Sequence, residues 1–380
     1  MNFKYLIIIL TILFSFSCTN KSSKERVFQD IIETTLVKHP KAIGIMVHVE
    51  APDQSISWSG SVGYSNWDKT QIIETDQPAL IASMTKNYVA VSILRLVEQG
   101  KIDLFQSIKE VLSKNTSDLM LKSGFDISKI NIAQLLGHKG GIQDYYDNPE
   151  FENIFANNPN YKWTRDEQIN LAIALGPRSL PETSYNYSDT NYLLLTEILE
   201  QKTGVKYYQA IKELIDYNKL KLEQTWFYSL EPTPSNTKPL IHQYRPSLND
   251  DSYKIHPSVD LYGGGGIAAT TKDVAKYAQN VFEGNVFENN KTLDLMFTDI
   301  ETKEGNPFEE NWQNIPCDYY LGIFDCGVDN INSYWHSGYW GTIFRYFPEI
   351  NATVVFYVIN GAEFPNIEID LMNQIITTLK

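Results

Sequence analysis

The stretch Ser83-Met84-Thr85-Lys86 places a serine and a lysine three residues apart, directly before a segment with apolar residues at helical spacing. That segment runs from Asn87 to Glu98 and is followed by Gly100, which is typical of a helix end. Residues i and i+3 share one face of a helix, so the lysine side chain is expected beside the serine hydroxyl. The N-terminus of a helix also offers free N–H groups and partial positive charge to a developing oxyanion.

This pairing predicts nucleophilic chemistry. A serine hydroxyl becomes a useful nucleophile beside a base, and a lysine that gives up its proton can serve. We therefore predict Ser83 as a nucleophile assisted by Lys86. The pattern also occurs at Ser235-Asn236-Thr237-Lys238, where Pro239 follows and no helix aligns the two side chains. The structural alternative for Ser83 is a helix-capping serine beside a solvated lysine.

A second motif, Tyr185-Asn186-Tyr187-Ser188-Asp189, contains a candidate proton carrier about 100 residues later. A phenol near a cationic lysine can shuttle protons because its anion is stabilised, so we predict this role for Tyr187. Similar tyrosine patterns occur at Tyr64-Ser65-Asn66 and Tyr146-Asp147-Asn148, and the chain has 23 tyrosines. Most of these matches are expected to be packing or loop residues.

A third motif, His336-Ser337-Gly338, lies on a predicted C-terminal strand. Such a strand can present a backbone N–H to an oxyanion, and a glycine lets the substrate backbone approach closely. We predict that these three residues line the substrate groove. His138-Lys139-Gly140 is a rival match, and either histidine can instead be a hydrogen-bonded structural residue.

The three motifs in this order resemble the family of class C β-lactamases, DD-carboxypeptidases and related esterases. The resemblance runs from about Lys41 to Val358. It implies that Ser83 forms an acyl-enzyme while Lys86 and Tyr187 share acid–base work. It also implies that the backbone N–H groups of Ser83 and Tyr339 form an oxyanion hole. The run Gly263 to Gly266 then forms a close-packing turn, and no cofactor is expected.

Two positions depart from the family pattern. The second motif usually ends in asparagine, but this chain has Asp189, which could pair with Lys86 or attract a cationic amine on the substrate. Class C β-lactamases have lysine at the position of His336, whereas the carboxypeptidases and esterases often have histidine. Arg345 is a candidate to replace the missing positive charge.

The expected fold is α/β (α+β), with an antiparallel sheet built from both chain ends and flanked by helices. A hairpin is predicted over 42–49 and 55–60, and further strands are predicted over 319–324, 332–336, 342–347 and 352–359. Predicted helices include 25–39, 191–201, 207–215, 272–282 and 365–379. A large, mostly helical lobe, roughly 100–300, is inserted between the two groups of strands.

The N-terminus resembles an export signal. Lys4 precedes an apolar run from Tyr5 to Phe16, which is too short to span a bilayer. The segment ending at Cys18 resembles a lipobox, although Ser15 stands where leucine is usual. We therefore predict a signal peptide over 1–17, and lipidation at Cys18 that anchors an exported, periplasmic or cell-surface lipoprotein to a membrane. The tether and first helix occupy 18–40, and the hydrolase domain occupies 41–380.

Composition limits the possible partners. Lys plus Arg total 32 against 46 for Asp plus Glu, a net charge of −14 that argues against nucleic acid. The six histidines show no metal-binding spacing, so no metal is expected. Because a single strand over 319–324 would hold Cys317 and Cys326 apart, we expect two free thiols unless a turn intervenes.

The predicted function is a serine hydrolase acting on D-amino-acid peptide, ester or β-lactam substrates, most like a carboxypeptidase or esterase. Its partner would be a small molecule or peptide, such as one derived from the cell wall. Two alternatives remain: a catalytically weakened binding or sensor domain of the same fold, motivated by Asp189, and a scaffold that displays aromatic loops.

Overall fold

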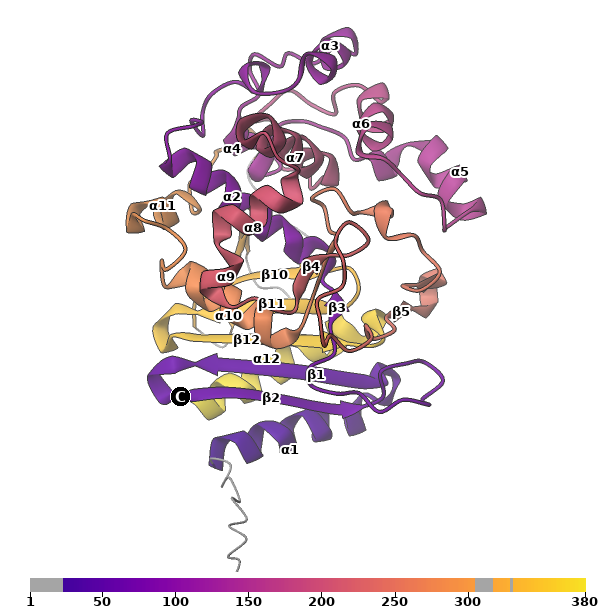
Figure 1. The fold of residues 1–380 in the computed structure, drawn as a ribbon, viewed down its shortest axis with the longest axis vertical. Coiled ribbons are helices and arrows are strands. Elements are labelled where there is room, and N and C mark those ends of the chain that lie inside the picture. The colour runs from indigo at the N-terminus through magenta and orange to yellow at the C-terminus, as the bar shows by residue number, and fades with distance from the viewer. Residues whose placement is uncertain (1–22, 305–316, 329–330) are drawn as a thin grey trace, which may run out of the picture.

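The computed structural model describes residues 23–304, 317–328 and 331–380. It contains a seven-stranded antiparallel sheet in the order β2-β1-β12-β11-β10-β9-β8. Figure 1 shows the strands from β2 to β10 below the helical lobe. The strands are β1 (Gly44–Ala51), β2 (Ile56–Gly63), β8 (Asp318–Tyr319), β9 (Phe324–Asp325), β10 (Tyr334–Gly338), β11 (Thr342–Phe347) and β12 (Ala352–Val358). Residues from both chain ends therefore share one sheet, which confirms the predicted fold class.

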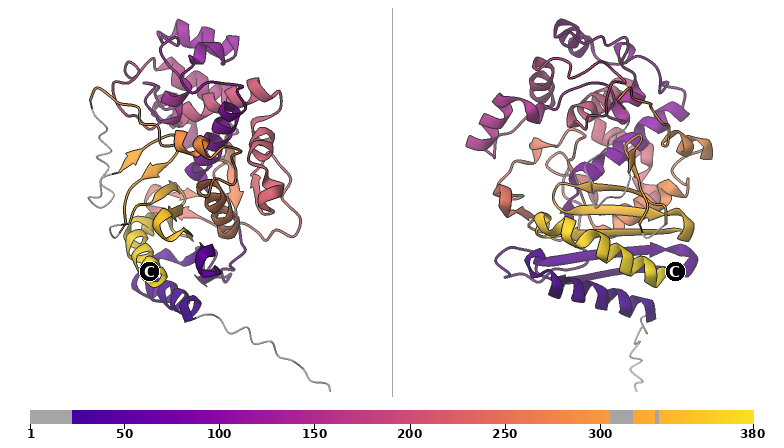
Figure 2. Two further views of the ribbon diagram at one scale, coloured as in Figure 1. Left: turned by 90° about the vertical axis from the view of Figure 1, so that its left-hand side faces the viewer. Right: turned by 180° about the vertical axis from the view of Figure 1, so that it is seen from behind.

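Helices cover both faces of this sheet. On one face α1 (Ser23–Lys38) and α12 (Phe364–Leu379) lie against each other, as both views of Figure 2 show. On the other face α10 (Thr271–Phe282) packs on β1 and β12. Alternate residues of β1 enter the two separate cores, Val47 with α1 and α12, and Met46 with the helical lobe. Helix α1 is thus part of the folded domain, although the sequence analysis grouped it with the tether.

The mostly helical lobe lies between β2 and β8 in the chain, which confirms the predicted insertion between the two groups of strands (Figure 1). Its central helix α2 (Thr85–Glu98) is almost entirely buried and packs on α7 (Asp189–Thr203) and α8 (Tyr207–Ile215). The other helices are α3 (Lys114–Lys122), α4 (Ile132–Leu136), α5 (Pro149–Asn157), α6 (Arg165–Ala174), α9 (Tyr217–Leu220) and α11 (Asn290–Leu295).

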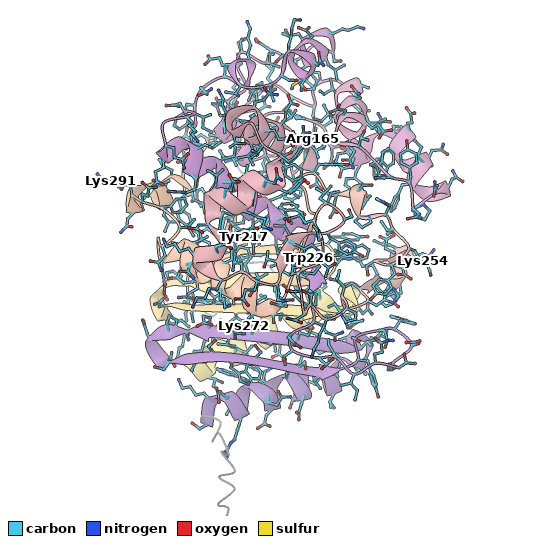
Figure 3. The ribbon with its side chains drawn as sticks, in the orientation of Figure 1. Arg165, Tyr217, Trp226, Lys254, Lys272 and Lys291 are labelled. Carbon is cyan, nitrogen blue, oxygen red and sulfur yellow. A yellow bond between two sulfur atoms is a disulfide. The ribbon has the colours of Figure 1, made fainter. Side chains whose placement is uncertain are left out.

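Two small sheets complete the lobe. One contains β3 (Ala79–Leu80), β7 (Ile267–Ala269) and β4 (Thr225–Phe227), and the other pairs β5 (Tyr244–Arg245) with β6 (Asp250–Asp251). Tyr217 and Trp226 are buried where the lobe meets the sheet, whereas Lys254 and Lys291 lie at the outer surface (Figure 3). Strand β3 leads directly into the segment that contains Ser83.

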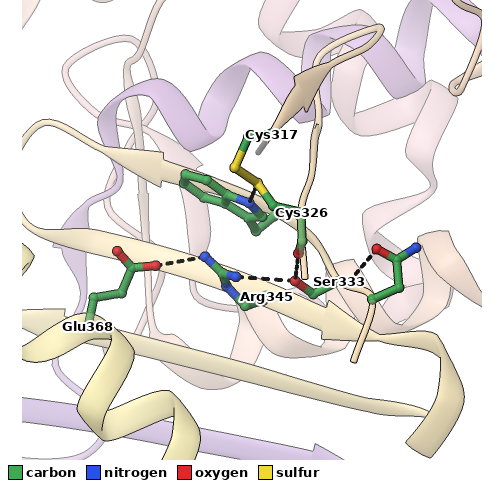
Figure 4. The surroundings of a disulfide bond; sticks show 7 residues. Cys317, Cys326, Ser333, Arg345 and Glu368 are labelled. Carbon is green, nitrogen blue, oxygen red and sulfur yellow. Dashed lines mark hydrogen bonds and ion pairs between the residues drawn. A yellow bond between two sulfur atoms is a disulfide. The ribbon is translucent and has the colours of Figure 1, made fainter. Parts of the chain in front are cut away.

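The prediction of two free thiols is wrong, because Cys317 and Cys326 form a disulfide with Cα atoms 4.7 Å apart (Figure 4). The residues between them do not form one extended strand. They form the hairpin of β8 and β9, whose turn contains Gly322 at φ 77°. The positive φ is a conformation that glycine adopts readily, and the turn brings the two cysteines to adjacent positions.

Arg345 cannot replace a charge in the substrate groove, so that suggestion is wrong. Trp335 pairs with Arg345 across β10 and β11, and His336 pairs with Phe344, so Arg345 and His336 point to opposite faces of the sheet. The Arg345 guanidinium is buried, 2.8 Å from Glu368 of α12, and also bonds to Ser333 (Figure 4). It ties the sheet to the C-terminal helix.

The predicted signal peptide and Cys18 lie outside the described residues. Over 23–304, 317–328 and 331–380, every helix is too short or too polar to cross a bilayer.

Candidate active site

Ser83 lies in a short 3₁₀ turn (Ala82–Met84) that continues into α2. Ala82 has φ 45°, a left-handed conformation that is unfavourable for alanine. Such local strain is often found where a fold presents a functional side chain. One turn later, Lys86 points back and its Nζ lies 2.8 Å from Ser83 Oγ, as the Ser-x-x-Lys spacing predicts.

Lys86 is completely buried and has three oxygen partners. Besides Ser83 Oγ, its Nζ lies 2.8 Å from the Gly264 carbonyl and 2.6 Å from Asp189 Oδ1. Three acceptors match the three N–H bonds of an ammonium group, so this arrangement fits a protonated lysine. The ion pair between Lys86 and Asp189 is one of the two outcomes that the sequence analysis considered for Asp189.

Tyr187 joins this group from the loop before α7. Its hydroxyl is hydrogen-bonded to Ser83, and Lys86 Nζ lies 4.9 Å from the centre of its ring. Burial and the nearby Asp189 charge raise the pKa of Tyr187 well above its ordinary value. Tyr187 is therefore a neutral phenol at rest, and its role as a proton carrier stays a prediction.

Ser83, Tyr187 and Asp189 open onto a cavity of about 400 Å³. Its walls combine carboxylates with large aromatic and aliphatic side chains. The remaining lining residues are Asp144, Tyr146, Phe155, Asp250, Ile255, Val259, Asp260, Tyr339 and Trp340. Among the described residues that line this cavity there is no lysine, arginine or histidine. The lining of the cavity is thus acidic, and the buried Lys86 beside it is already paired with Asp189.

Asp144 and Asp260 are carboxylates of the cavity that the sequence analysis missed. Burial, followed by the charge of Asp189, raises the pKa of each of them to about 7. Asp144 lies next to a tyrosine pattern that was set aside as a loop. No local signal marks Asp260, which arrives from a loop more than 100 residues further along the chain.

The glycine run is a close-packing turn, as the resemblance implied. A Cβ on Gly264 would lie 2.4 Å from Asp189 Oδ2, and a Cβ on Gly265 would lie 2.1 Å from Asp260 Oδ2. Only glycine lets this backbone approach both carboxylates while the Gly264 carbonyl accepts a hydrogen bond from Lys86.

The third motif lies behind the site and does not line the cavity. His336 is 1% exposed; its Nδ1 donates to the Ser337 carbonyl at 2.8 Å, and its Nε2 accepts from the Tyr319 hydroxyl at 3.3 Å. Burial and the charge of Lys86 lower the pKa of His336 to about 3, so the ring is neutral. A Cβ on Gly338 would lie 2.1 Å from the Ile81 carbonyl, so this glycine allows β10 to approach the turn that contains Ser83.

Tyr339, which follows this motif, does reach the cavity. Its carbonyl accepts a hydrogen bond of 2.5 Å from Arg245 Nε, and its hydroxyl bonds to Asp250. The β5–β6 hairpin thereby holds the Tyr339 backbone at the rim, near Ser83. The two backbone N–H groups predicted to form the oxyanion hole belong to Ser83 and Tyr339, which both line the cavity, and their role stays a prediction.

The two rival matches have other surroundings. Lys238 forms ion pairs with Glu74 and Asp76, in the loop between β4 and β5 and not at the start of a helix. His138 is buried and lies against the ring of Tyr187, with ring centres 4.3 Å apart.

Three features define a hydrolase of the β-lactamase and penicillin-binding-protein type. They are a Ser-x-x-Lys turn at the start of a buried helix, a neutral tyrosine that contacts the serine, and a sheet built from both chain ends. The family model described as Beta-lactamase matches residues 32–372. The chain therefore belongs to the Beta-lactamase family.

Individual relatives are distant. Penicillin-binding protein 4* of Bacillus subtilis is 22% identical over 302 residues, covering 76% of this chain and 62% of that protein. Teichoic acid D-alanine hydrolase of Staphylococcus aureus is 24% identical over 244 residues, covering 63% of this chain and 55% of that protein. This chain thus spans less than two thirds of either relative.

Solved structures show the same fold. D-amino acid amidase from Ochrobactrum anthropi SV3 superposes with a TM-score of 0.76 at 19% identity, covering 94% of this chain and 98% of that one. D-stereospecific amidohydrolase from a Streptomyces species gives 0.73 at 20% identity, with 91% and 98% covered.

Proposed function

We propose that this protein hydrolyses acyl substrates through a covalent intermediate on Ser83. The observation that supports the proposal most directly is that Ser83, which lines the cavity, contacts both Lys86 Nζ and the Tyr187 hydroxyl through its Oγ. These are the groups that an activated serine needs: a proton acceptor on one side and a proton carrier on the other.

The protons can be followed through one cycle. Lys86 becomes an acceptor once its proton passes to Asp189 across their 2.6 Å ion pair, which leaves a neutral amine beside Ser83. Ser83 then gives its proton to Lys86 and its oxygen bonds to the acyl carbon. The leaving group departs with a proton delivered through the Tyr187 hydroxyl, and Lys86 returns a proton to Tyr187. Water reverses these transfers and releases the acid.

The charge of the cavity narrows the substrate class. Four aspartates line it without a lysine, arginine or histidine. Asp144 and Asp260 ionise above about pH 7, so a substrate carboxylate would meet repulsion at alkaline pH. Two charges about 4 Å apart interact by about 4 kcal/mol at an effective dielectric constant of 20, which is enough to decide specificity. We therefore propose amides and esters whose acyl group carries a free ammonium, such as those of α-amino acids.

The described residues contain no group of three acidic, histidine or cysteine side chains arranged to hold a metal ion.

The names of several similar proteins are in accord with this class. They refer to a D-amino acid amidase and to a teichoic acid D-alanine hydrolase. By that similarity we propose D-amino acid amides and esters before carboxypeptidase or β-lactam substrates.

The first experiment tests the nucleophile. A fluorophosphonate probe should label the wild-type protein at Ser83, and Ser83→Ala should abolish labelling. Ser235→Ala, which alters the other Ser-x-x-Lys match, should be labelled normally. Folded wild-type protein that reacts with neither the probe nor any ester would refute the proposal.

The second experiment tests the charge of the substrate. At pH 8, D-alanine p-nitroanilide should be cleaved at least 10-fold faster, in kcat/KM, than its N-acetyl derivative. Asp260→Asn should reduce that preference, mainly by raising KM for the free amine. Equal rates for the two compounds, or faster cleavage of a penicillin, would contradict an ammonium-selective cavity.

The binding or sensor alternative is favoured by one observation, the threefold hydrogen bonding of Lys86. If Asp189 holds that lysine permanently protonated, ligands would bind without turnover. Comparing the wild type with Asp189→Asn on short-chain esters separates the two functions. Hydrolysis by either protein favours the enzyme, and none by both favours the binder.

We further propose that the protein is exported and anchored to a membrane through lipidated Cys18. The basic and apolar N-terminus supports this location, and the disulfide between Cys317 and Cys326 is in accord with an oxidising compartment. Radiolabelled palmitate should be incorporated by the wild type and not by Cys18→Ser. Unlabelled wild-type protein that fractionates entirely with soluble proteins would refute the anchor.

A further inference from the structure

His138 holds the chain on both sides of Tyr187. It follows α4 with φ 58°, and its carbonyl accepts the Asn186 N–H at 2.9 Å. Its ring Nδ1 accepts the Ser188 N–H at 3.1 Å. The two residues that flank Tyr187 are therefore both bonded to one histidine.

The ring of His138 also lies directly against the phenol. The ring centres of His138 and Tyr187 are 4.3 Å apart with an angle of 33° between the planes. Tyr192 and Tyr319 pack around the same imidazole, with ring centres 5.2 and 5.0 Å away. The Tyr187 phenol is thus packed against an aromatic cluster, and its hydroxyl is bonded to Ser83.

The protonation state of His138 follows from its contacts. A backbone N–H can only donate, so Nδ1 is an acceptor and the ring proton is on Nε2. Burial and the charge of Lys86 lower the pKa of His138 well below its ordinary value, so the ring is neutral. Nε2 is buried and has no hydrogen-bond partner among the described residues. A donor left unsatisfied in the interior lowers stability, so stability alone does not explain a histidine here.

We propose that His138 is a positioning residue for Tyr187, which keeps the phenol hydroxyl on Ser83. The inference rests on the proposed function, because His138 acts only through Tyr187. It predicts that the effect of changing His138 disappears when Tyr187 has no hydroxyl.

A double-mutant cycle tests this dependence. In His138→Asn, asparagine tolerates the left-handed backbone and its side-chain oxygen can still accept the Ser188 N–H, so mainly the ring is lost. The measured quantity is the rate at which a small alkyl fluorophosphonate modifies Ser83. His138→Asn should slow the maximal rate at least 10-fold with little change in the half-saturating concentration. In a Tyr187→Phe background the same change should cost less than about 2-fold.

Controls separate the possible failures. His48→Asn changes another buried histidine, bonded to Ser59 and Glu50 on the sheet, and should label like the wild type. Equal losses in both backgrounds, or no loss in the wild-type background, would overturn the role of His138 alone. Absence of Ser83 labelling in the wild type would instead overturn the proposed function.

A measurement on the wild-type protein covers the case in which His138→Asn does not fold. Nitrogen-15 NMR of the histidine rings should show one neutral ring, assigned to His138, with its proton on Nε2. This ring should not titrate between pH 5 and 9, and its shifts should be those of a buried imidazole that accepts a hydrogen bond at Nδ1. If only His48 and His336 resist titration, or if every neutral ring carries its proton on Nδ1, the proposal fails.

Discussion

Asp189 determines the state of the residues around the nucleophile. Its carboxylate pairs with Lys86, raises the pKa of Tyr187, and contributes to the raised pKa values of Asp144 and Asp260. An asparagine at this position would keep the hydrogen bond to Lys86 and remove the charge. Burial is the largest cause of these three raised pKa values, and the charge that the departure from the family pattern introduces adds to each of them.

The raised pKa of Asp260 predicts a pH-dependent stability. Its pKa is about 7 in the folded protein against 3.8 for an ordinary aspartate. The protonated carboxyl therefore contributes its full stability below about pH 4, and this contribution to the free energy of unfolding is lost as the pH rises through 7. Asp260→Asn removes this loss. The difference in free energy of unfolding between Asp260→Asn and the wild type should be more favourable to the variant at pH 8 than at pH 5. We expect a change of about 1 to 3 kcal/mol, a range that allows for the partial solvent access of Asp260.

Urea unfolding of both proteins at the two pH values measures this difference. Asp30→Asn, on the exposed surface of α1, is the matched control and should change stability equally at both pH values. A difference between Asp260→Asn and the wild type that does not vary with pH would show that Asp260 is ionised in the folded protein at pH 5.

Among the secondary-structure elements, α2 and the turn from Gly263 to Gly266 form the site together. Helix α2 carries Lys86, and the turn supplies the carbonyl of Gly264 that Lys86 binds. The turn then leads into β7, which pairs with β3 just before Ser83. The nucleophile and the turn are therefore held by the same small sheet.

Gly264→Ala should reduce activity more than stability. The added Cβ would lie 2.4 Å from Asp189 Oδ2 and must displace the carboxylate that pairs with Lys86. We expect at least a 10-fold fall in the rate of Ser83 labelling and a loss of about 1 to 3 kcal/mol in unfolding free energy. Gly137→Ala, where the nearest atom would be 3.4 Å away, should label like the wild type. Normal labelling of Gly264→Ala would contradict the role assigned to the turn.

Across the whole molecule, the first and last described segments pack together in one sheet and one helix pair. Strand β1 pairs with β12, and α1 packs on α12, while the core of the helical lobe includes Met46 and Phe344 from the sheet. The lobe therefore cannot lose its contact with the sheet without exposing its own core. This arrangement predicts that lobe and sheet unfold together.

Glu368→Gln tests this coupling. It leaves the Arg345 guanidinium buried without its charged partner, which should cost about 3 kcal/mol. Unfolding followed by far-ultraviolet circular dichroism and by tryptophan fluorescence should give one coincident transition, shifted equally by the substitution. Two transitions that do not coincide would show that parts of the molecule unfold independently, which contradicts this coupling.

The elements of this fold could be predicted because their patterns are local. Helical spacing marks α2 and α10, and strand patterns mark β1, β11 and β12, with bounds within a few residues of those observed. The close contact of Ser83 with Lys86 needed only the geometry of one helical turn. The glycine turn was also correctly interpreted as a close-packing feature.

The composition of the cavity was set by contacts between distant parts of the chain. Asp144 and Asp260 meet Asp189 only because two separate loops converge on the first residue of α7. His336 faces the core and Arg345 the opposite side of the sheet because of strand register, in which a shift of one residue exchanges the two faces. The pairing of Cys317 with Cys326 depended on a turn at Gly322. Local periodicity specifies helices and strands, whereas register, turn position and loop convergence depend on the free energy of packing the whole chain.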